Sequence, residues 1–286
     1  MDKFYVITNM QKDPQLKVAK GIQKYLEKRG KECLVQEMAQ SDIIQNYKYT
    51  DPAKIPLDVE CVLVLGGDGT VLQASRDLVE RDIPLFGINI GTLGYLAEIG
   101  ADYIEPALDK LILDDYVTEK RMMLQGTAYH GRKHILSDVA LNDIVISRSG
   151  RLRVIDVNIF VNDRFLNSYS ADGIIVSTPT GSTGYNLSVG GPIVSPSASM
   201  ILLTPIAPHT LTARSVILPD DAKVKIEIER RNGSDEEAEV TFDGDTSVKM
   251  KGKDFIEIEK SNRTVRFVKI DQISFLEILR RKMSGA

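Results

Sequence analysis

One short segment of the sequence, Gly66-Gly67-Asp68-Gly69-Thr70, combines the residue types that phosphate chemistry requires. Glycines let the backbone turn tightly and approach a ligand closely, and the start of a helix presents unpaired N–H groups that attract phosphate. The segment is neither a Walker loop nor a Gly-x-Gly-x-x-Gly fingerprint. Its single carboxylate can accept the proton of a hydroxyl nucleophile or help to hold a metal-nucleotide. We therefore expect phosphoryl transfer to an alcohol, with Asp68 at the reacting centre.

Two further segments are rich in glycine and hydroxyl residues. Residues 87–96 follow the next expected strand, so we expect them beside the first loop, where the two form a cleft; alone, they suit a tight connection equally well. Residues 171–192 offer backbone donors, hydroxyl groups and the ring of Tyr185, which suits the recognition of ribose, amide and base edges. Asn142-Asp143 adds an amide for a base and a carboxylate for ribose hydroxyls.

The sequence lacks the residues that zinc sites, disulfide frameworks, serine hydrolases and thiol redox enzymes require. Cys33 and Cys61 are too few and too far apart for a zinc site or a disulfide framework, which favours a reducing compartment. The three histidines show no metal-ligand spacing, and the sequence has no Gly-x-Ser-x-Gly, Cys-x-x-Cys or His-Glu-x-x-His motif. We expect no dedicated metal site in the protein. Any Mg²⁺ should arrive with the phosphoryl donor.

The composition is that of an ordinary globular protein. The 286 residues are 43% hydrophobic and 27% charged, with a formal net charge of -4. This mild acidity argues against binding to the backbone of a nucleic acid but leaves a small anionic ligand possible. No run is long and apolar enough to span a membrane, and the first residues lead straight into a strand-like run without a signal peptide. We therefore expect a cytoplasmic protein.

Short apolar runs alternate with helical periodicity in the first third of the chain. Strands are expected at residues 4–8, 33–35, 61–65 and 83–88, and helices at residues 14–29, 71–80 and 104–113. Strands with apolar residues on both faces, separated by helices, indicate a parallel sheet covered on each side. Ligands bind at the carboxyl ends of such strands, which is where the glycine loop must lie.

After about residue 119 the pattern changes to the two-residue alternation of β-sheet. Asn232-Gly233 lies between residues 223–231 and 237–242, which is the short-range signal of a hairpin. Residues 275–282 are helical again and are expected to return to the first domain. We therefore predict an α/β domain of residues 1–118 and 271–286, and a β-rich domain of residues 119–270.

The glycine loop, Asn142-Asp143 and residues 172–192, in this order and over most of the chain, resemble the NAD kinase family. The resemblance implies ATP- or polyphosphate-dependent phosphorylation of the adenosine-side ribose 2′-hydroxyl of NAD, which gives NADP. It also implies a Rossmann-like N-terminal domain, a β-rich C-terminal dinucleotide-binding domain, and a homodimer or homotetramer. Diacylglycerol-type lipid kinases and phosphofructokinases share the short glycine motif, so the long C-terminal segment distinguishes the families.

The resemblance also implies roles for single residues. Asp68 matches the general base, and Asp243 matches a second acid near the reacting ribose and is the alternative base. Asn142 and Asp143 match the pair that binds NAD, and Asp172 matches the acid of an Asp-Gly motif. The other residues expected around the nucleotide are Gly69, Thr70, Tyr95, Arg153, Ser170, Thr183, Gly184, Tyr185, Asn186, Leu187, Ser188, Ala207 and Asp245. Gly184 stands where many members carry alanine.

Two other functions share part of this pattern. A diacylglycerol-type lipid kinase has the first loop, but it has no use for the polar Ser-Thr-Gly segment and needs an apolar entry for acyl chains. A non-catalytic NAD sensor keeps the pocket but tolerates the loss of Asp68, so the presence of Asp68 disfavours it.

A homo-oligomer is also expected from the apolar residues of the sheet region. Val154, Phe160 and Ile201-Leu202-Leu203 are expected to form an exposed face. A second copy of the chain is the simplest cover for such a face.

Overall fold

The computed structural model describes residues 1–36, 50–91, 94–150, 154–229, 237–270 and 274–284. The chain forms two compact units, of which the first comprises Met1–Arg121 and Thr264–Ala286 and the second comprises Met122–Arg263. Each unit has its own buried apolar cluster. Helices around a parallel sheet in the first unit, and mostly strands in the second, confirm the predicted α/β class with a β-rich C-terminal part.

The first unit is built on a parallel sheet in the order β17-β4-β3-β1-β2, with β5 also paired to β4. All residues of β3 are buried, as expected for a strand with apolar side chains on both faces. The elements of this unit are β1 (Lys3–Thr8), α1 (Lys17–Glu27), β2 (Glu32–Val35), β3 (Cys61–Gly66), α2 (Asp68–Asp77), β4 (Leu85–Asn89), β5 (Ile99–Gly100), α3 (Ile104–Ile112) and α5 (Phe275–Met283), with short 3-10 helices at Pro14–Leu16, Pro52–Lys54 and Ala101–Tyr103.

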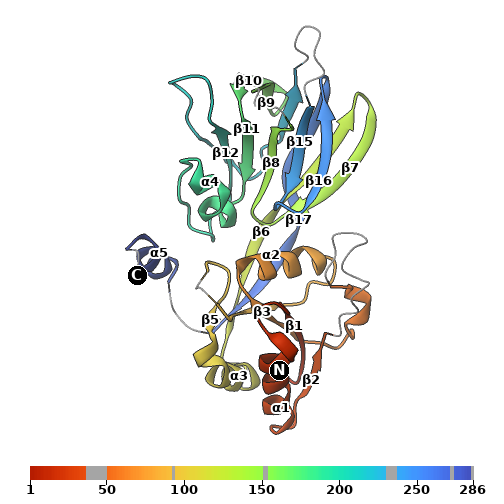
Figure 1. The fold of residues 1–286 in the computed structure, drawn as a ribbon, viewed down its shortest axis with the longest axis vertical. Helices are drawn as coiled ribbons and strands as arrows, with labels where there is room; N and C mark the ends of the chain where they lie inside the picture. The colour runs from red at the N-terminus through yellow and green to blue at the C-terminus, as the bar shows by residue number, and fades with distance from the viewer. Residues whose placement is uncertain (37–49, 92–93, 151–153, 230–236, 271–273, 285–286) are drawn as a thin grey trace. The chain divides into compact units, whose positions relative to one another are not determined.

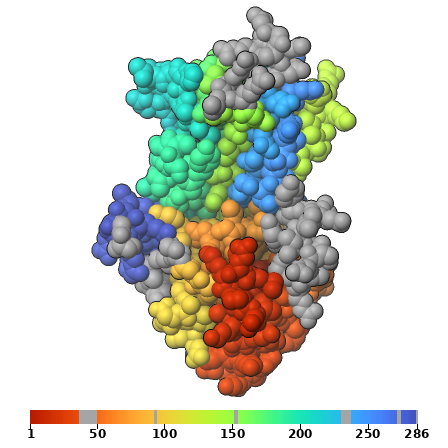
Figure 2. Space-filling view, in the orientation of Figure 1, coloured from red at the N-terminus to blue at the C-terminus, as the bar shows by residue number. Residues whose placement is uncertain are grey.

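Helices cover both faces of this parallel sheet (Figure 1). α1 and α3 share one buried cluster with Leu63 of β3, while α2 places Val71 against Gly87 of β4 on the other face. α1 and α3 also adjoin at the surface (Figure 2), where Tyr25 donates a hydrogen bond to Asp109 at 3.0 Å. This packing leaves the carboxyl ends of β3 and β4 to the two glycine-rich loops.

α5 begins with a side-chain capping interaction. The hydroxyl of Ser274 accepts a hydrogen bond from the N–H of Glu277 at 3.2 Å. The ring of Phe275 lies 6.5 Å from the ring of Tyr95, in the loop after β4. No helix in the part of the chain that the structure describes is long and apolar enough to cross a membrane.

The second unit consists of two sheets whose apolar faces share one core. One sheet has the order β13-β12-β11-β8-β15-β16, and the other contains β10-β9-β14-β17 together with β6 and β7. Residues of both sheets, such as Ile144 and Ile226, belong to the same buried cluster. The elements are β6 (Val117–His130), β7 (Lys133–Ala140), β8 (Asp143–Arg148), β9 (Ile155–Val161), β10 (Arg164–Ala171), β11 (Gly173–Ser177), the 3-10 helix Thr180–Thr183, α4 (Tyr185–Ser188), β12 (Met200–Ile206), β13 (Val216–Pro219), β14 (Val224–Ile228), β15 (Glu237–Phe242), β16 (Thr246–Lys251) and β17 (Asp254–Lys269).

The predicted hairpin around Asn232-Gly233 is wrong. β14 pairs with β9 and β17, whereas β15 pairs with β8 and β16, so the two strands belong to different sheets. The turn residues themselves lie outside the described part of the chain. The real hairpin joins β15 to β16 through Asp243-Gly244, both with positive φ (+52° and +72°), as such short turns require.

The predicted exposed face is also wrong in part. Ile201, Leu202 and Leu203 of β12 are all fully buried within the second unit. Val154 and Phe160 are half-buried. Exposed apolar side chains on edge strands are instead found at Phe165 and Leu166 of β10, at Ile135 of β7 and at Ile217 of β13.

Candidate active site

The first glycine loop connects β3 directly to α2. β3 ends at Gly66, Gly67 is extended, and Asp68, Gly69 and Thr70 form the first turn of α2. The first N–H groups of a helix have no acceptor within the helix and lie at the positive end of its dipole. Gly66 has no room for a side chain, because a Cβ there would lie 2.2 Å from Oγ1 of Thr70. This segment, residues 66–70, is therefore a turn suited to phosphate, and we call it the phosphate turn.

The second glycine group positions the carboxylate of Asp68. Its Oδ2 accepts a hydrogen bond from the N–H of Tyr95 at 2.7 Å, and its Oδ1 accepts one from the N–H of Leu96 at 3.0 Å. Gly94 permits this approach, because a Cβ on Gly94 would lie 1.9 Å from Oδ1. The two loops therefore build one structure around a single carboxylate.

The Asp68 carboxylate keeps its capacity to accept a proton. A carboxylate has about four lone-pair directions, and the two backbone N–H groups occupy one on each oxygen. The side chain is half-buried, so it is restrained without being sealed from a substrate. A carboxylate held in this way suits phosphoryl transfer to a hydroxyl, for which the position of a proton acceptor is decisive.

In the second unit, Asp243 holds the turn that precedes β8. Its Oδ2 accepts a hydrogen bond from the N–H of Leu141 at 2.8 Å, and its Oδ1 accepts those of Asn142 and Asp143 at 2.8 Å and 3.0 Å. The N–H of Asp243 in turn donates to the carbonyl of Asp143 at 3.0 Å. The carboxylate of Asp243 therefore orders the backbone of the Asn142-Asp143 pair.

Asp143 is a buried carboxyl group next to Asp243. Its side chain lies inside the unit, with 6% of the residue exposed. Burial raises the pKa of Asp143 to about 7, and the charge of Asp243 acts in the same direction. The group therefore changes its charge near neutral pH, which is a common property of residues that handle ligands or protons.

The long polar segment after β11 wraps around Asn142. The N–H of Thr178 donates to the carbonyl of Asn142 at 2.8 Å, and the hydroxyl of Ser177 donates to it at 3.1 Å. A Cβ at Gly184 would lie 3.6 Å from Nδ2 of Asn142 and 3.9 Å from Oδ2 of Asp143. The structure therefore brings Asn142, Asp143 and Gly184 together, and an alanine at position 184 would still nearly fit.

The other predicted residues of this segment divide into supporting and accessible ones. Asn186 is fully buried, where its Nδ2 donates to the carbonyls of Ser182 and Pro192 and its Oδ1 accepts from Thr204 at 2.7 Å. Tyr185 is 47% exposed. Leu187 and Ser188 are also exposed, and Thr183 is half-buried. Asn186 therefore holds the segment in its conformation through hydrogen bonds, while Tyr185, Leu187 and Ser188 are accessible to a ligand.

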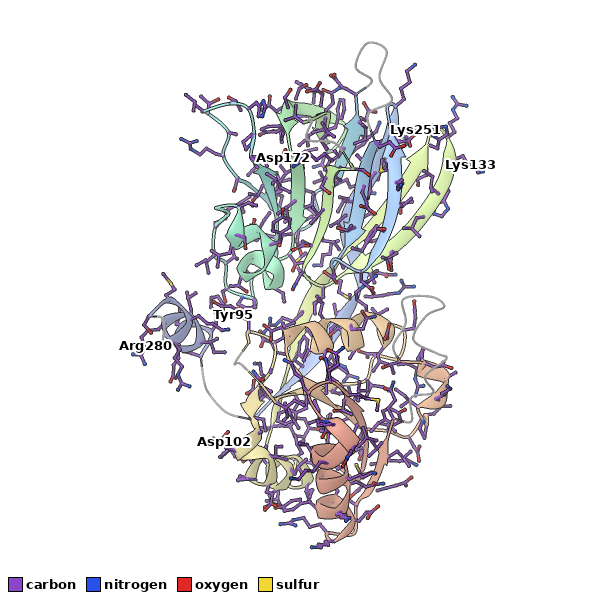
Figure 3. All side chains as sticks on the ribbon, in the orientation of Figure 1. Tyr95, Asp102, Lys133, Asp172, Lys251 and Arg280 are labelled. Carbon is purple, nitrogen blue, oxygen red and sulfur yellow. The ribbon has the colours of Figure 1, made fainter. Side chains whose placement is uncertain are left out.

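Asp172 lies at the other end of β11 (Figure 3). Ser177 faces Asp143 across the sheet and Gly173 faces Ser147, so Asp172 follows the far end of this pairing. At about 3.4 Å per residue, Asp172 is about 17 Å from Ser177. The structure therefore does not bring Asp172 to the Asn142-Asp143 pair.

Asp172 belongs instead to a second cluster of predicted residues. Its Oδ1 accepts a hydrogen bond from Nε of Arg148 at 2.8 Å, and its N–H donates to the carbonyl of Ile206, next to Ala207. The carbonyl of Ser170 accepts the N–H of His209 at 2.8 Å. Ser170, Asp172 and Ala207 are therefore neighbours, and we call them the distal cluster.

Three predicted residues remain. Tyr95, labelled in Figure 3, contributes its N–H to Asp68. Nζ of Lys282 lies 5.7 Å from the centroid of the Tyr95 ring. Asp245 closes the hairpin turn, with its N–H donating to the carbonyl of Phe242 at 3.0 Å. Arg153 lies outside the described residues.

The chain matches the ATP-NAD kinase N-terminal domain over residues 5–116 and the ATP-NAD kinase C-terminal domain over residues 141–270. This chain belongs to the NAD kinase family. An NAD kinase of Lachnospira eligens is 47% identical over 293 residues, which cover 99% of this chain and 100% of that protein. An NAD kinase of Lachnoclostridium phytofermentans is 46% identical over 285 residues, covering 99% of each chain.

Two solved structures share the NAD kinase fold with this chain. Yeast NADH kinase complexed with NADH superposes with a TM-score of 0.84 at 22% identity, covering 100% of this chain and 88% of the yeast chain. An NAD kinase from Archaeoglobus fulgidus in complex with ATP gives a TM-score of 0.77 at 26% identity, covering 99% of each chain. These comparisons confirm the family resemblance and the fold class that the sequence predicted.

The structure gives a role to two residues of this chain that no sequence motif indicates. Gly94 was part of the second glycine group, but its purpose emerges only from the position of the Asp68 carboxylate. Arg148 ends β8 without any local signal, and only the sheet places it beside Asp172. Gly94 acts on the carboxylate of Asp68 and Arg148 on that of Asp172, and the sequence motifs indicate both of these aspartates.

Proposed function

We propose that this chain is an NAD kinase that transfers a phosphoryl group from ATP or polyphosphate to the 2′-hydroxyl of the adenosine ribose of NAD, giving NADP. The observation that carries the proposal is the Asp68 carboxylate, held by two backbone N–H groups within the phosphate turn. Relatives named NAD kinase that match essentially the whole chain support it.

In the proposed reaction, Asp68 accepts the proton of the 2′-hydroxyl while that oxygen attacks the terminal phosphorus of the donor. A bond forms between the ribose oxygen and phosphorus, and the bond from phosphorus to the bridging oxygen breaks, so that ADP or a shortened polyphosphate leaves. The N–H groups of Asp68 and Gly69 at the start of α2, with the hydroxyl of Thr70, stabilise the charge of the transferred group.

We assign the recognition of NAD chiefly to the second unit. The side chain of Asn142 would read an adenine edge, Asp143 would accept hydroxyl groups of a ribose, and the exposed ring of Tyr185 would contact a base. Asp243 would contribute by ordering this turn, and its role as an alternative base stays a prediction. The further residues that we propose around the same NAD are Tyr95, Arg153, Thr183, Gly184, Asn186, Leu187, Ser188 and Asp245. The distal cluster, Ser170, Asp172 and Ala207, lies at the far end of β11, so we propose that it contacts the NAD bound by a second copy of the chain.

The affinity for NAD should depend on pH through Asp143. Ribose hydroxyls donate to the ionised carboxylate, and the pKa of Asp143 is about 7, so acid keeps the group protonated and opposes binding. We expect the affinity to rise between pH 5.5 and 7, by up to about tenfold per pH unit, and to level off above pH 7. Calorimetric titration of NAD at several pH values measures this.

The matched control for this pH dependence is Asp143→Asn, which stays neutral at every pH. We expect the variant to bind NAD weakly and without the rise between pH 5.5 and 7. Equal affinity of the wild type at pH 5.5 and pH 8 would show that the carboxylate does not receive the ribose.

Mg²⁺ is proposed to arrive with the phosphoryl donor. Within the described residues, no three His, Cys, Asp or Glu side chains form a cluster suited to a metal ion. Mg²⁺ commonly keeps several waters and binds through substrate phosphates. We therefore propose that the phosphates of the donor carry the ion. When bound, it would neutralise charge on the donor phosphates, and phosphate oxygens and water would be its main ligands.

We also propose a homodimer or homotetramer. The distal cluster lies at the far end of β11 from the Asn142-Asp143 pair. We propose that its polar side chains contact a second copy of the chain. Phe165, 59% exposed on the edge strand β10, is a side chain that a second copy would cover. Light scattering should give a multiple of 31.8 kDa, whereas full activity at a mass near 31.8 kDa would contradict an assembly.

The proposed location is the cytoplasm. Cys33 and Cys61 are both free and buried, which suits a reducing compartment. NAD and ATP are the proposed small-molecule partners there. Neither a nucleic acid nor a membrane is part of the proposal.

One assay separates the proposed function from its alternatives. The protein is incubated with ATP and Mg²⁺ and with either NAD or diacylglycerol, and the products are identified. An NAD kinase forms NADP alone, and a lipid kinase forms phosphatidate alone. A non-catalytic sensor binds NAD in calorimetry but forms neither product.

A further inference from the structure

The loop of residues 94–98, which we call the positioning loop, supplies the two N–H groups that hold the Asp68 carboxylate. On one side this loop lies against β4, where the N–H of Glu98 donates a hydrogen bond to the carbonyl of Gly87 at 2.8 Å. A Cβ on Gly87 would lie 2.9 Å from Cα of Ala97, so the two backbones are in close contact. Further contacts of the positioning loop come from the C-terminal part of the chain.

The end of β17 anchors the positioning loop at Glu98. Oε2 of Glu98 forms an ion pair with Nζ of Lys269 at 2.5 Å, and its Oε1 accepts a hydrogen bond from the N–H of Ile270 at 3.3 Å. The side chain of Glu98 is 6% exposed and that of Lys269 is 21% exposed, so salt screens this ion pair less than a surface pair. Nζ of Lys110 in α3 also donates to the carbonyl of Ile270 at 3.0 Å. These contacts fix the end of β17 to the positioning loop and to α3.

α5 contacts the ring of Tyr95, in the positioning loop, at two points. The centroid of the Phe275 ring lies 6.5 Å from that of the Tyr95 ring, with the ring planes inclined at 44°. Nζ of Lys282 lies 5.7 Å from the centroid of the same ring. Both distances are within the ranges of attractive aromatic and cation–π contacts. Phe275 and Lys282 are about two helical turns apart, so one face of α5 lies along Tyr95.

Another face of α5 is exposed. Leu276 is 70% exposed, and Arg280, which is labelled in Figure 3, is exposed as well. Among the residues that the structure describes, no carboxylate pairs with Lys282, so the Tyr95 ring is the group that its charge contacts. The two faces of one helix therefore offer test positions and matched control positions.

We propose that α5 acts as a brace for the positioning loop and thereby fixes the Asp68 carboxylate for phosphoryl transfer, with the end of β17 as a second attachment. The inference rests on the proposed function, in which Asp68 accepts the proton of the hydroxyl. Tyr95 connects the two parts, because its ring contacts α5 and its N–H donates to Oδ2 of Asp68 at 2.7 Å. Phe275 and Lys282 are therefore positioning residues.

The first test is the steady-state kinetics of Phe275→Ala and Lys282→Gln. A contact can raise the population of the productive position by no more than its own free energy. We therefore expect kcat to fall by about 2- to 5-fold in Lys282→Gln, which loses one cation–π contact. Phe275→Ala loses an aromatic contact and buried apolar area, and its kcat should fall by about 10-fold. KM for ATP should stay unchanged in both variants.

Conservative variants and control positions complete the kinetic series. Phe275→Tyr keeps an aromatic ring and Lys282→Arg keeps the charge, so both should retain most of the wild-type kcat. Leu276→Ala and Arg280→Gln alter the exposed face of the same helix and should leave kcat unchanged. Thermal unfolding verifies that each variant is folded.

The second test asks whether the brace acts through the Asp68 carboxylate. In an Asp68→Asn background there is no base to position, so adding Phe275→Ala should lower the residual kcat by less than about twofold. Losses of equal size in the two backgrounds would show that Phe275 affects catalysis by another route, and would overturn the brace.

The third test does not depend on catalysis. Hydrogen exchange measured by mass spectrometry reports on the amides of the positioning loop, which include those of Tyr95 and Leu96. We expect these amides to exchange several-fold faster in Phe275→Ala than in the wild type, and at the wild-type rate in Leu276→Ala. Unchanged exchange in Phe275→Ala would overturn the brace whatever the activity.

The possible results separate the brace from the proposed function. A wild-type protein that forms no NADP overturns the proposed function, and hydrogen exchange still tests the brace. A wild-type protein that forms NADP, with unchanged kcat in Phe275→Ala and Lys282→Gln, overturns the brace alone. A near-normal kcat in Asp68→Asn overturns both the role of Asp68 as the base and the role of the brace in positioning it.

Discussion

Replacement of Asp68 by asparagine should lower kcat for NADP formation by about 10²- to 10⁴-fold, the range typical of losing a general base. The amide has nearly the same shape, and its oxygen can still accept one of the two N–H groups that hold the carboxylate. It cannot take up the proton of the 2′-hydroxyl. A coupled assay with an NADP-specific dehydrogenase measures kcat, and thermal unfolding reports whether the fold is intact.

Asp243→Asn is the natural companion of this variant. The Asp243 carboxylate accepts three backbone N–H groups around Asn142-Asp143, so its replacement should raise KM for NAD more than it lowers kcat. The opposite pair of results, a near-normal kcat in Asp68→Asn and a collapsed kcat in Asp243→Asn, would assign the base to Asp243.

Gly94→Ala should be nearly as damaging, although it alters no functional group. The new Cβ would lie 1.9 Å from Oδ1 of Asp68, and the carboxylate is the movable partner in this clash. If it rotates away, it loses its hydrogen bonds to Tyr95 and Leu96, and a base displaced by about 1 Å costs about 10²-fold in rate. We expect kcat to fall by about that factor, and stability by about 1–3 kcal/mol.

The cause of the Gly94→Ala effect can be isolated with a double mutant. In an Asp68→Ala background the clash is gone, so adding Gly94→Ala should cost almost no further stability in urea unfolding. Gly21→Ala is the matched control, because Gly21 in α1 has no atom within 4 Å of a new Cβ. Equal stability losses from Gly94→Ala in both backgrounds would place its effect elsewhere in the loop.

Local patterns in the sequence predict most of the first unit. Apolar residues at every position of 61–65 require a strand covered on both faces, and β3 is buried throughout. The helix expected from residue 14 begins only at Lys17, because Gln15 and Leu16 have φ values of +62° and +58°. In this conformation the Asp13 carboxylate accepts N–H groups of the first turn of α1. Periodicity cannot reveal such a capping contact.

Strand partners in the second unit are beyond the reach of sequence patterns. Alternation shows which side chains of β14 and β15 face the core, but both sheets face the same core, so it does not show which strands pair. The same limit applies to the site. The motifs predict Asp143 and Asp172 around one ligand, yet Asp143 in β8 lies opposite Ser177 at one end of β11, and Asp172 precedes the other end of β11. Only the sheet register reveals this separation.

The position of the phosphate in the product tests the central claim most directly. The wild type and Asp68→Asn are each incubated with NAD, ATP and Mg²⁺, and the phosphorylated product is examined by ³¹P NMR. We predict one new phosphate monoester, on the 2′-carbon of the adenosine ribose, formed by the wild type about 10² times faster than by the variant, or more. Phosphate on another hydroxyl, no phosphorylated NAD at all, or equal rates in the two proteins would contradict the assignment.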